Sequence, residues 1–378
     1  MAEPKKLPRC LYCGLEIVRR SREHLLPAAL GGRRVSRRIC CGSCNNKLNE
    51  AVDRPFLAAV APLTTILGKR TGRGRPVAPI RGLRSEGLPF SIESGGTPRL
   101  AKPVVERREL EGGREQVLIR ADTREAAEEI LGQILADPEI RRTAPVVLEE
   151  QSGFLDDLDL RVSLGGASHF RQTLKCALNL LAAETRDNER LREATSLASD
   201  YATKGRPLPA GWVGHAFPVD WLPRDPIGRF DHRIMIATSA ETGLAAGVLE
   251  LFGAILSSCV LSDSWQGQSL TVEYALDPST EKHRTRRLPG SKRLLLEEVV
   301  ASRPTPGDLK SRMAEFFLDL DEHQRNSYLE SEIDGAFAAA GVSEDGPATD
   351  EQRRLLAGEL ATRLSRLVLR LPGTRRLD

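Results

Sequence analysis

The N-terminal part of the chain predicts a short strand followed by two helices. Leu15–Val18 is a brief apolar stretch, which favours a strand. Leu48 and Val52 lie four residues apart, as on one face of a helix that begins at Asn45. Apolar residues then recur at helical spacing over 55–68, with a proline near the start, so a second helix is predicted there.

The middle of the chain predicts a small α/β unit and then two helices. Over 101–165, a hairpin is predicted around two glycines, followed by a helix with Asp122 as its N-cap. The hairpin strands are 104–110 and 115–120, and the two later helices are 169–181 and 188–203.

The remaining residues predict an antiparallel sheet and then helices. The strands are expected at 232–238, within 248–261 and at 270–274, and the basic stretch 282–287 as an exposed loop. The helices are expected at 308–318, 322–340 and 350–371. The fold class is therefore α+β, with a small N-terminal domain, a larger mixed region with a mostly antiparallel sheet, and C-terminal helices. Four segments are predicted: 1–68, 69–100 as a basic linker or arm, 101–290 of unknown role, and 291–378.

Composition supports a globular protein outside the membrane. Of 378 residues, 40% are hydrophobic, and no apolar run is long and continuous enough to span a bilayer. Met1–Lys6 has two lysines but no apolar core after them, so a secretory signal is not predicted. A cytoplasmic location is the expectation.

Charge is distributed unevenly along the chain. Residues 1–110 carry 22 Lys and Arg against 9 Asp and Glu, a net charge of +13, whereas the whole chain carries +3. Such asymmetry indicates a polyanion partner for the N-terminal part, although a solvated basic face is the alternative. The Gly/Arg-rich stretch 69–76 is equally compatible with a flexible linker and with contact to a phosphate backbone.

Five of the seven cysteines lie between residues 10 and 44. Cys10 and Cys13 form one Cys-x-x-Cys pair, and Cys41 and Cys44 form another, which is the spacing of a four-ligand zinc site. Cys40 offers a competing register for the second pair. The isolated cysteines, Cys176 and Cys259, stand in apolar surroundings and are predicted as core thiols.

A Glu-His dipeptide lies between the cysteine pairs. His24 is the natural general base near neutral pH. Glu23, together with the oxygen of Asn45, could hold a hard divalent cation such as magnesium. The basic run 33–38 follows and favours contact with a phosphate backbone over a plain solvated loop.

The arrangement Cys-x-x-Cys, Glu-His-x-x-Pro, Leu-Gly-Gly and Cys-x-x-Cys-Asn over residues 8–55 resembles the HNH endonuclease family, which has the ββα-metal fold. The resemblance implies structural zinc on Cys10, Cys13, Cys41 and Cys44. It further implies that His24 activates water and that Glu23 and Asn45 hold catalytic magnesium or manganese, with DNA as the partner. The residues expected to contact DNA are Arg22, Arg33, Arg34, Arg37, Arg38 and Lys47.

The chain departs from the family pattern at two positions. The metal-binding carboxylate is often Asp, and here it is Glu23. The middle Asn of the family name would fall near Ser36, so the hydrogen bond that orients the His must come from elsewhere. Resembling proteins also carry a downstream Lys-x-Ala-x-Asn-Leu segment, here Lys175 to Leu180. With His169, its Lys175 and Asn179 could line a functional face, but a plain helix polar face is the favoured interpretation.

Two other functions share parts of this pattern. A zinc-knuckle module that binds nucleic acid without catalysis would use the same cysteines and basic residues, but it would not need Glu23, His24 and Asn45. A redox protein using Cys-x-x-Cys is disfavoured by the paired spacing. A homodimer is left open, and the terminal helix could pack on the second domain or on a partner.

Overall fold

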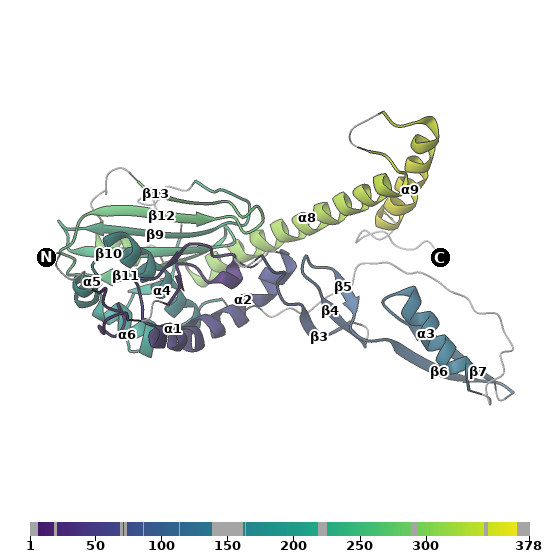
Figure 1. The fold of residues 1–378 in the computed structure, drawn as a ribbon, viewed down its shortest axis with the longest axis horizontal. Coiled ribbons are helices and arrows are strands. Elements are labelled where there is room, and N and C mark those ends of the chain that lie inside the picture. Colours follow the sequence, from purple (N-terminus) through teal and green to yellow (C-terminus); the bar gives the residue numbers. More distant parts are fainter. Residues whose placement is uncertain are drawn as a thin grey trace. The chain divides into compact units, whose positions relative to one another are not determined.

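The computed structural model describes residues 7–18, 21–68, 71, 74–85, 87–112, 114–137, 162, 164–217, 225–288, 294–301, 303–343 and 347–368. The chain forms two compact units. Its fold is mixed α+β, as predicted (Figure 1). Unit 1 comprises residues 1–78 and 161–317, and unit 2 comprises 79–160 and 318–378. The predicted four-segment division stays a prediction. Among the described residues, no helix is both long and apolar enough to cross a membrane.

The N-terminal segment (residues 7–68) begins with a cysteine-bearing turn and a small hairpin. Strand β1 (Glu23–His24) pairs antiparallel with β2 (Val35–Ser36), so that Glu23 lies opposite Ser36 and His24 opposite Val35. The helical elements that follow are α1 (Gly42–Leu48), the π-helical turn η2 (Asn49–Asp53) and α2 (Arg54–Ile66). The strand predicted over Leu15–Val18 is wrong, because only an isolated bridge between Arg9 and Glu16 forms there.

Two glycines fix the connection between β1 and β2. Gly31 ends the short helix η1 (Ala28–Leu30) with a φ of 84°, a left-handed conformation that suits glycine. At Gly32, an added Cβ would lie 1.9 Å from the carbonyl oxygen of Leu26. The Leu-Gly-Gly sequence is therefore a packing requirement of this loop.

Unit 1 is built on a six-stranded antiparallel sheet in the order β13-β12-β9-β10-β11-β8. The strands are β8 (Val213–His215), β9 (His232–Ser239), β10 (Leu244–Leu251), β11 (Ile255–Ser262), β12 (Leu270–Leu276) and β13 (His283–Arg287). The single strand predicted within 248–261 is instead parts of two strands, which turn at Phe252–Gly253. The predicted basic loop 282–287 is mostly strand β13.

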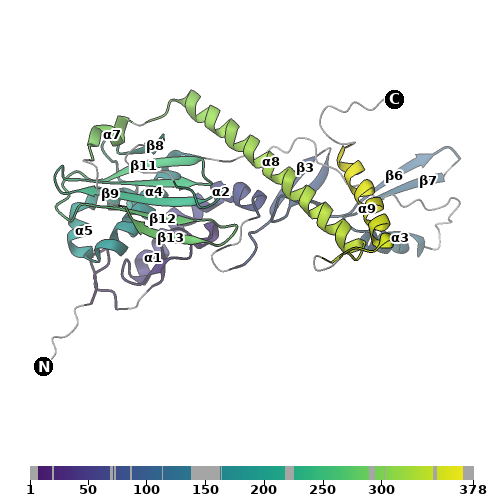
Figure 2. The ribbon, with the colours of Figure 1, turned by 90° about the horizontal axis from the view of Figure 1, so that it is seen from above.

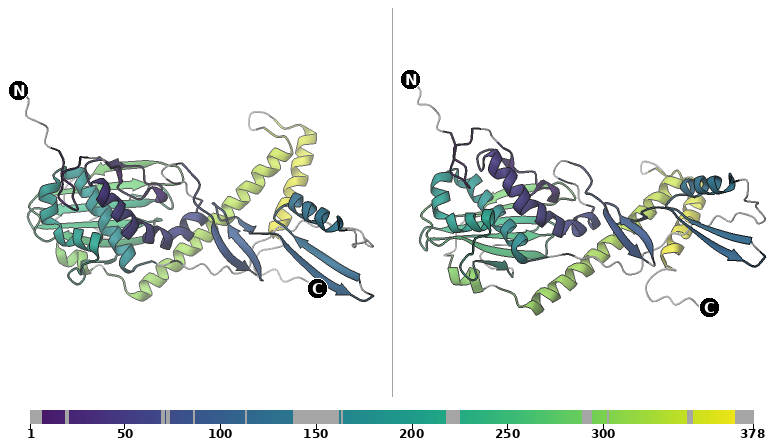
Figure 3. Two further views of the ribbon diagram at one scale, coloured as in Figure 1. Left: turned by 60° about the horizontal axis from the view of Figure 1, so that its bottom comes forward. Right: turned by 90° about the horizontal axis from the view of Figure 1, so that it is seen from below.

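Helix α4 (Gly166–Thr185) covers one face of this sheet, and the N-terminal segment packs on the other side of α4 (Figures 1 and 3). At Gly247 on β10, an added Cβ would lie 2.4 Å from the Cβ of Ala177, so glycine permits the close approach of α4. The opposite face carries a hydrophobic cluster that includes Trp212, Val260 and Val299. Val299 lies on α7 (Leu296–Ala301), which runs beside β11 (Figure 2).

Two further helices follow α4. The prediction of one helix over 188–203 is wrong, because α5 (Asn188–Ala194) and α6 (Ser196–Lys204) are separated at Thr195. The isolated thiols of Cys176 and Cys259 are fully buried, as predicted. His232 at the start of β9 is buried, and its Nδ1 atom accepts a hydrogen bond from the Phe252 amide at 3.1 Å.

Unit 2 contains two small sheets and helices. A three-stranded sheet joins β3 (Ile80–Ser85), β4 (Leu88–Ile92) and β5 (Pro98–Leu100), so part of the expected linker is folded. Half of the Gly/Arg-rich stretch 69–76 lies outside the described residues.

The predicted hairpin of unit 2 is present, and helix α3 lies beside it. The helix is capped by Thr123 rather than by the predicted Asp122, since the Thr123 hydroxyl accepts from the Ala126 amide. Unit 2 also contains the later part of α8, which is one continuous helix where two were predicted. The elements are β6 (Val104–Leu110), β7 (Arg114–Arg120), α3 (Arg124–Leu135), α8 (Pro306–Ala339) and α9 (Asp350–Val368).

Candidate functional site

Four cysteines meet at one point in the N-terminal segment. The sulfur atoms of Cys10, Cys13, Cys41 and Cys44 all lie within 4.8 Å of one another, and those of Cys13 and Cys41 are 3.8 Å apart. In a tetrahedral zinc site, Zn–S bonds of about 2.3 Å place the sulfurs about 3.8 Å apart. The cluster is therefore consistent with structural zinc.

The structure also resolves the competing register of the second pair. Cys41 is the N-cap of α1, and its sulfur accepts from the Cys44 amide at 3.5 Å. Cys40 is buried on another side, where its sulfur lies 3.8 Å from Oε2 of Glu23. Cys41, and not Cys40, belongs to the cluster.

Glu23 is directed into the protein interior. It is 2% exposed, and its Oε1 atom lies 2.8 Å from Nζ of Lys175 and accepts from Nδ2 of Asn179 at 2.9 Å. Burial raises the pKa of Glu23, and the nearby ammonium of Lys175 opposes that rise. Among the described contacts, the remaining oxygen, Oε2, faces the Cys40 thiol.

Lys175 joins two carboxylates from the N-terminal segment. Its ammonium also donates to both oxygens of Asp53, at 2.7 and 2.6 Å. Burial alone would lower the pKa of Lys175, but Asp53 and Glu23 outweigh burial and raise it, so the side chain stays charged. One buried cation therefore serves two carboxylates that lie far from it in sequence.

Asn179 lies one helical turn beyond Lys175 on α4 and contacts the Glu-His dipeptide. Besides its bond to Glu23, its Nδ2 atom donates to the backbone oxygen of His24 at 3.2 Å. Its Oδ1 atom accepts from the hydroxyl of Tyr12 at 2.7 Å. Tyr12 is part of the first Cys-x-x-Cys turn, so the cysteine cluster and the dipeptide are linked through α4.

His24 and Asn45 lie nearer the surface than Glu23. Both residues are of intermediate exposure. The Asn45 Nδ2 atom donates to the Ser21 hydroxyl and, at 3.5 Å, to the Arg22 backbone oxygen, which ties α1 to the residues before β1. Ser36 cannot replace the family Asn through a carboxamide, and its hydroxyl accepts from the Arg38 amide at 3.2 Å.

The predicted DNA-contacting residues fall into two groups. Arg33 and Arg34 turn towards the rest of unit 1, where Arg33 pairs with Glu281 and Arg34 with Glu184, the latter at 2.7 Å. The hydroxyl of Tyr274 on β12 accepts from both of their backbone amides, at 3.4 and 3.3 Å. The other four side chains are exposed and make no ion pair within the described part of the chain: Arg22, Arg37, Arg38 and Lys47.

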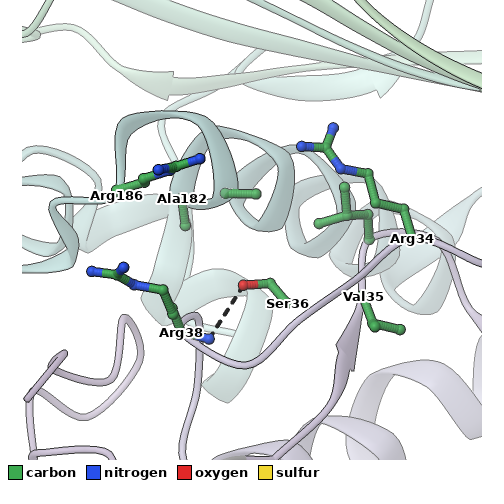
Figure 4. Close-up of a pocket in the computed structure, with 8 residues that line it drawn as sticks. Arg34, Val35, Ser36, Arg38, Ala182 and Arg186 are labelled. Atoms are coloured by element: carbon green, nitrogen blue, oxygen red, sulfur yellow. Dashed lines mark hydrogen bonds between the residues drawn. The ribbon is translucent and has the colours of Figure 1, made fainter.

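A basic pocket lies between β2 and the end of α4. Its volume is about 350 Å³, and Arg34, Arg38 and Arg186 line it (Figure 4). Arg186, the residue after α4, has a φ of 59° in the left-handed region. The other residues that line the pocket are Leu25, Val35, Ser36, Ala182 and Ala183.

The polar side chains of α4 were predicted to form a plain polar helix face, and this prediction is wrong. His169, Lys175 and Asn179 are all buried, because α4 lies between the sheet and the N-terminal segment. Asp53 and Tyr12 were not expected in the site at all. The sequence signal for the α4 residues was the set of polar side chains in a helix flanked by leucines, which suits burial between two partners.

Comparison with known proteins identifies one family. Residues 10–60 match the model of a family described as HNH endonuclease, and this part of the chain is an HNH endonuclease domain. The match contains all four cysteines of the cluster, Glu23, His24 and Asn45, whereas α4 lies outside it. No curated protein and no solved structure matches the chain.

Proposed function

We propose that this protein is a metal-dependent endonuclease that hydrolyses phosphodiester bonds in DNA. The observation that carries the proposal is the Glu23–His24 dipeptide, which lies on a hairpin beside a four-cysteine cluster within an HNH endonuclease domain. Zinc on the four cysteines would hold this hairpin in place without taking part in the reaction.

In the proposed mechanism, His24 is the general base. Water attacks the phosphorus, one proton of the water passes to the imidazole, and the P–O bond to the leaving oxygen breaks. The leaving oxygen then takes a proton from solvent. The intermediate exposure of His24 suits this role, because part of the residue is held by its surroundings and part is accessible.

Glu23 and Asn45 are the proposed ligands of a catalytic magnesium or manganese ion. Their donor types, a carboxylate and a carboxamide oxygen, are those that hard divalent cations prefer. Among the described contacts, Asn45 Oδ1 has no hydrogen bond, and Glu23 Oε2 faces the Cys40 thiol. Such an ion supplies neutralisation of the phosphate and stabilisation of the leaving oxygen.

The exposed arginines and the basic pocket support DNA as the partner. Arg38 and Arg186 present guanidinium groups that pair with no carboxylate among the described residues, and such groups bind phosphate well. The excess positive charge of residues 1–110 also favours a polyanion such as DNA as the partner. A cytoplasmic location is proposed as well, since none of the seven cysteines forms a disulfide, which suits a reducing compartment. Self-association stays a prediction.

One observation favours a second candidate, a DNA-binding module without catalysis. The Glu23 carboxylate is 2% exposed and already paired with Lys175, and a pure binding module could retain it for packing alone. In such a module His24 would have no chemical role, so the two candidates differ in what loss of His24 does.

The deciding experiment measures cleavage of linear, supercoiled, branched and single-stranded DNA with magnesium or manganese. The wild-type protein is expected to cut at least one of these, and His24→Ala to cut about 100-fold or more slowly, because general-base catalysis contributes on this scale. His24→Ala is expected to keep its zinc and its DNA affinity. Cleavage at the wild-type rate by this variant would rule out His24 as the base, and absence of cleavage by the wild type would favour the binding module.

A further inference from the structure

We propose that Asn179 of α4 is a positioning residue for the nuclease site, which therefore extends beyond the matched family segment. The inference deepens the proposed function and rests on it. Asn179 would not touch the reacting atoms. It would hold the Glu23–His24 dipeptide in the orientation that the reaction needs.

The contacts of Asn179 are concentrated on that dipeptide. One Nδ2 group donates both to the side chain of Glu23, at 2.9 Å, and to the backbone oxygen of His24, at 3.2 Å. Asn179 is fully buried, so water cannot replace these bonds when they are lost. A displacement of about 1 Å can slow an enzyme about 100-fold, so loss of these two hydrogen bonds should slow the chemical step.

Tyr12 fixes which end of the Asn179 carboxamide faces Glu23. The Tyr12 hydroxyl donates to Oδ1 at 2.7 Å, which leaves Nδ2 to face the carboxylate. Tyr12 lies between Cys10 and Cys13, so its position follows from the cysteine cluster. The contacts thus run without a gap from the cluster, through Tyr12 and Asn179, to His24.

The chain contains a matched control in Asn188, at the start of α5. Its Nδ2 atom also donates to backbone oxygens of the N-terminal segment, those of Arg9 and Arg38, at 2.6 and 2.5 Å. Asn188 is 8% exposed and, like Asn179, holds the N-terminal segment against the later helices. It has no described contact with Glu23 or His24, so it tests packing without positioning.

The experiment compares steady-state cleavage of DNA by full-length Asn179→Ala and Asn188→Ala. For Asn179→Ala, kcat is expected to fall about 100-fold while KM changes only a few-fold, because the phosphate-binding arginines are untouched. For Asn188→Ala, kcat should stay within about 3-fold of the wild type. An equal loss of kcat in the two variants, or wild-type kcat in Asn179→Ala, would overturn the proposal.

A second variant separates positioning from folding. Asn179→Asp preserves the size of the side chain and the acceptor for Tyr12, but it cannot donate to Glu23 and places a second carboxylate beside it. It should lose kcat as Asn179→Ala does while keeping the zinc content of the wild type. Wild-type kcat in Asn179→Asp would refute the role of the Nδ2 donor.

A spectroscopic measurement keeps the inference testable apart from cleavage. In protein labelled with ¹⁵N in the histidine rings, the His24 signal is the one missing from His24→Ala. It should shift in Asn179→Ala and stay in place in Asn188→Ala. If the wild type fails to cut DNA, the proposed function fails, but this signal still decides whether Asn179 positions His24: an unchanged signal in Asn179→Ala would refute the inference.

Discussion

The N-terminal segment is held together in two places that differ in chemistry. At the cysteine cluster, four sulfur atoms from residues 10–44 surround a position that suits zinc. At the Lys175 cluster, one ammonium binds Glu23 and Asp53, and it lies 122 residues from Asp53 in sequence. The first site joins parts of the segment to each other, whereas the second joins the segment to α4.

This difference has an energetic consequence. Metal binding contributes directly to the folding free energy of a small domain, because the unfolded chain offers no preformed site. A buried ion pair contributes less to the folding free energy, since desolvation of its charges offsets much of their attraction. With zinc bound, the cysteine cluster would stabilise the segment by itself, whereas the Lys175 cluster ties the segment to α4.

The largest expected effect is loss of the cysteine cluster. Cys44→Ala should lose one zinc ion per chain, and the hairpin of β1 and β2 should lose its order, because structural zinc contributes on the order of 10 kcal/mol to such domains. Zinc content by mass spectrometry and amide hydrogen exchange in residues 21–48 would measure both changes. Cys40→Ala is the control, since the Cys40 sulfur faces Glu23, and it should retain its zinc. Zinc retained by Cys44→Ala, or zinc lost by Cys40→Ala, would contradict the assignment of the four ligands.

Loss of the Lys175 charge should have the next largest effect. Lys175→Met leaves two buried carboxylates without their cation, and it should lower the free energy of unfolding by about 3–5 kcal/mol, as breaking a buried pair does. Urea unfolding followed by fluorescence would measure the change. Lys204→Met is the matched control, because Lys204 pairs with Asp200 near the surface, and about 0.5 kcal/mol or less is expected there. Similar losses in the two variants would mean that the buried cluster contributes no more than a surface pair.

The smallest expected effect concerns the basic pocket between β2 of the N-terminal segment and the end of α4. Arg186→Gly removes the guanidinium, and glycine readily adopts the left-handed backbone of this position, so stability should change by about 0.5 kcal/mol or less. DNA affinity should fall, and its dependence on salt should become less steep by about one released ion. The control is Arg190→Ala on the exposed side of α5. An unchanged salt dependence in Arg186→Gly would remove the pocket from the DNA-contacting surface.

The contrast between the two clusters also explains what the sequence could predict. The cysteine spacing, the Glu-His dipeptide and Asn45 lie close together in sequence, and their pattern indicated both the domain and its metal cluster. The roles of Lys175 and Asn179 depend on which helix packs against that domain, which local spacing does not contain. An amphipathic helix is expected to expose its polar face, but α4 has partners on both sides and buries it.

Other errors have similar physical origins. The run from Val248 to Leu261 is mostly apolar, and its turn uses Phe252 in a left-handed conformation, so Gly253 was the one residue whose type marked the break. The basic residues of β13 looked solvent-exposed, yet Arg284 and Arg286 pair with the buried Glu273 of the neighbouring strand. In β13, a partner on the neighbouring strand therefore determined the environment.

The discontinuity of unit 1 affects how the protein is made. During translation, Glu23 and Asp53 leave the ribosome well before Lys175, because the first part of unit 2 is encoded between them. At ordinary rates of protein synthesis, the 122 residues from Asp53 to Lys175 take on the order of 6–25 s. Throughout that interval the nascent N-terminal segment lacks Lys175, the cation that pairs with its carboxylates. It also lacks Asn179, whose side chain donates to the Glu23–His24 dipeptide. Completion of the site is thus delayed until α4 has been synthesised.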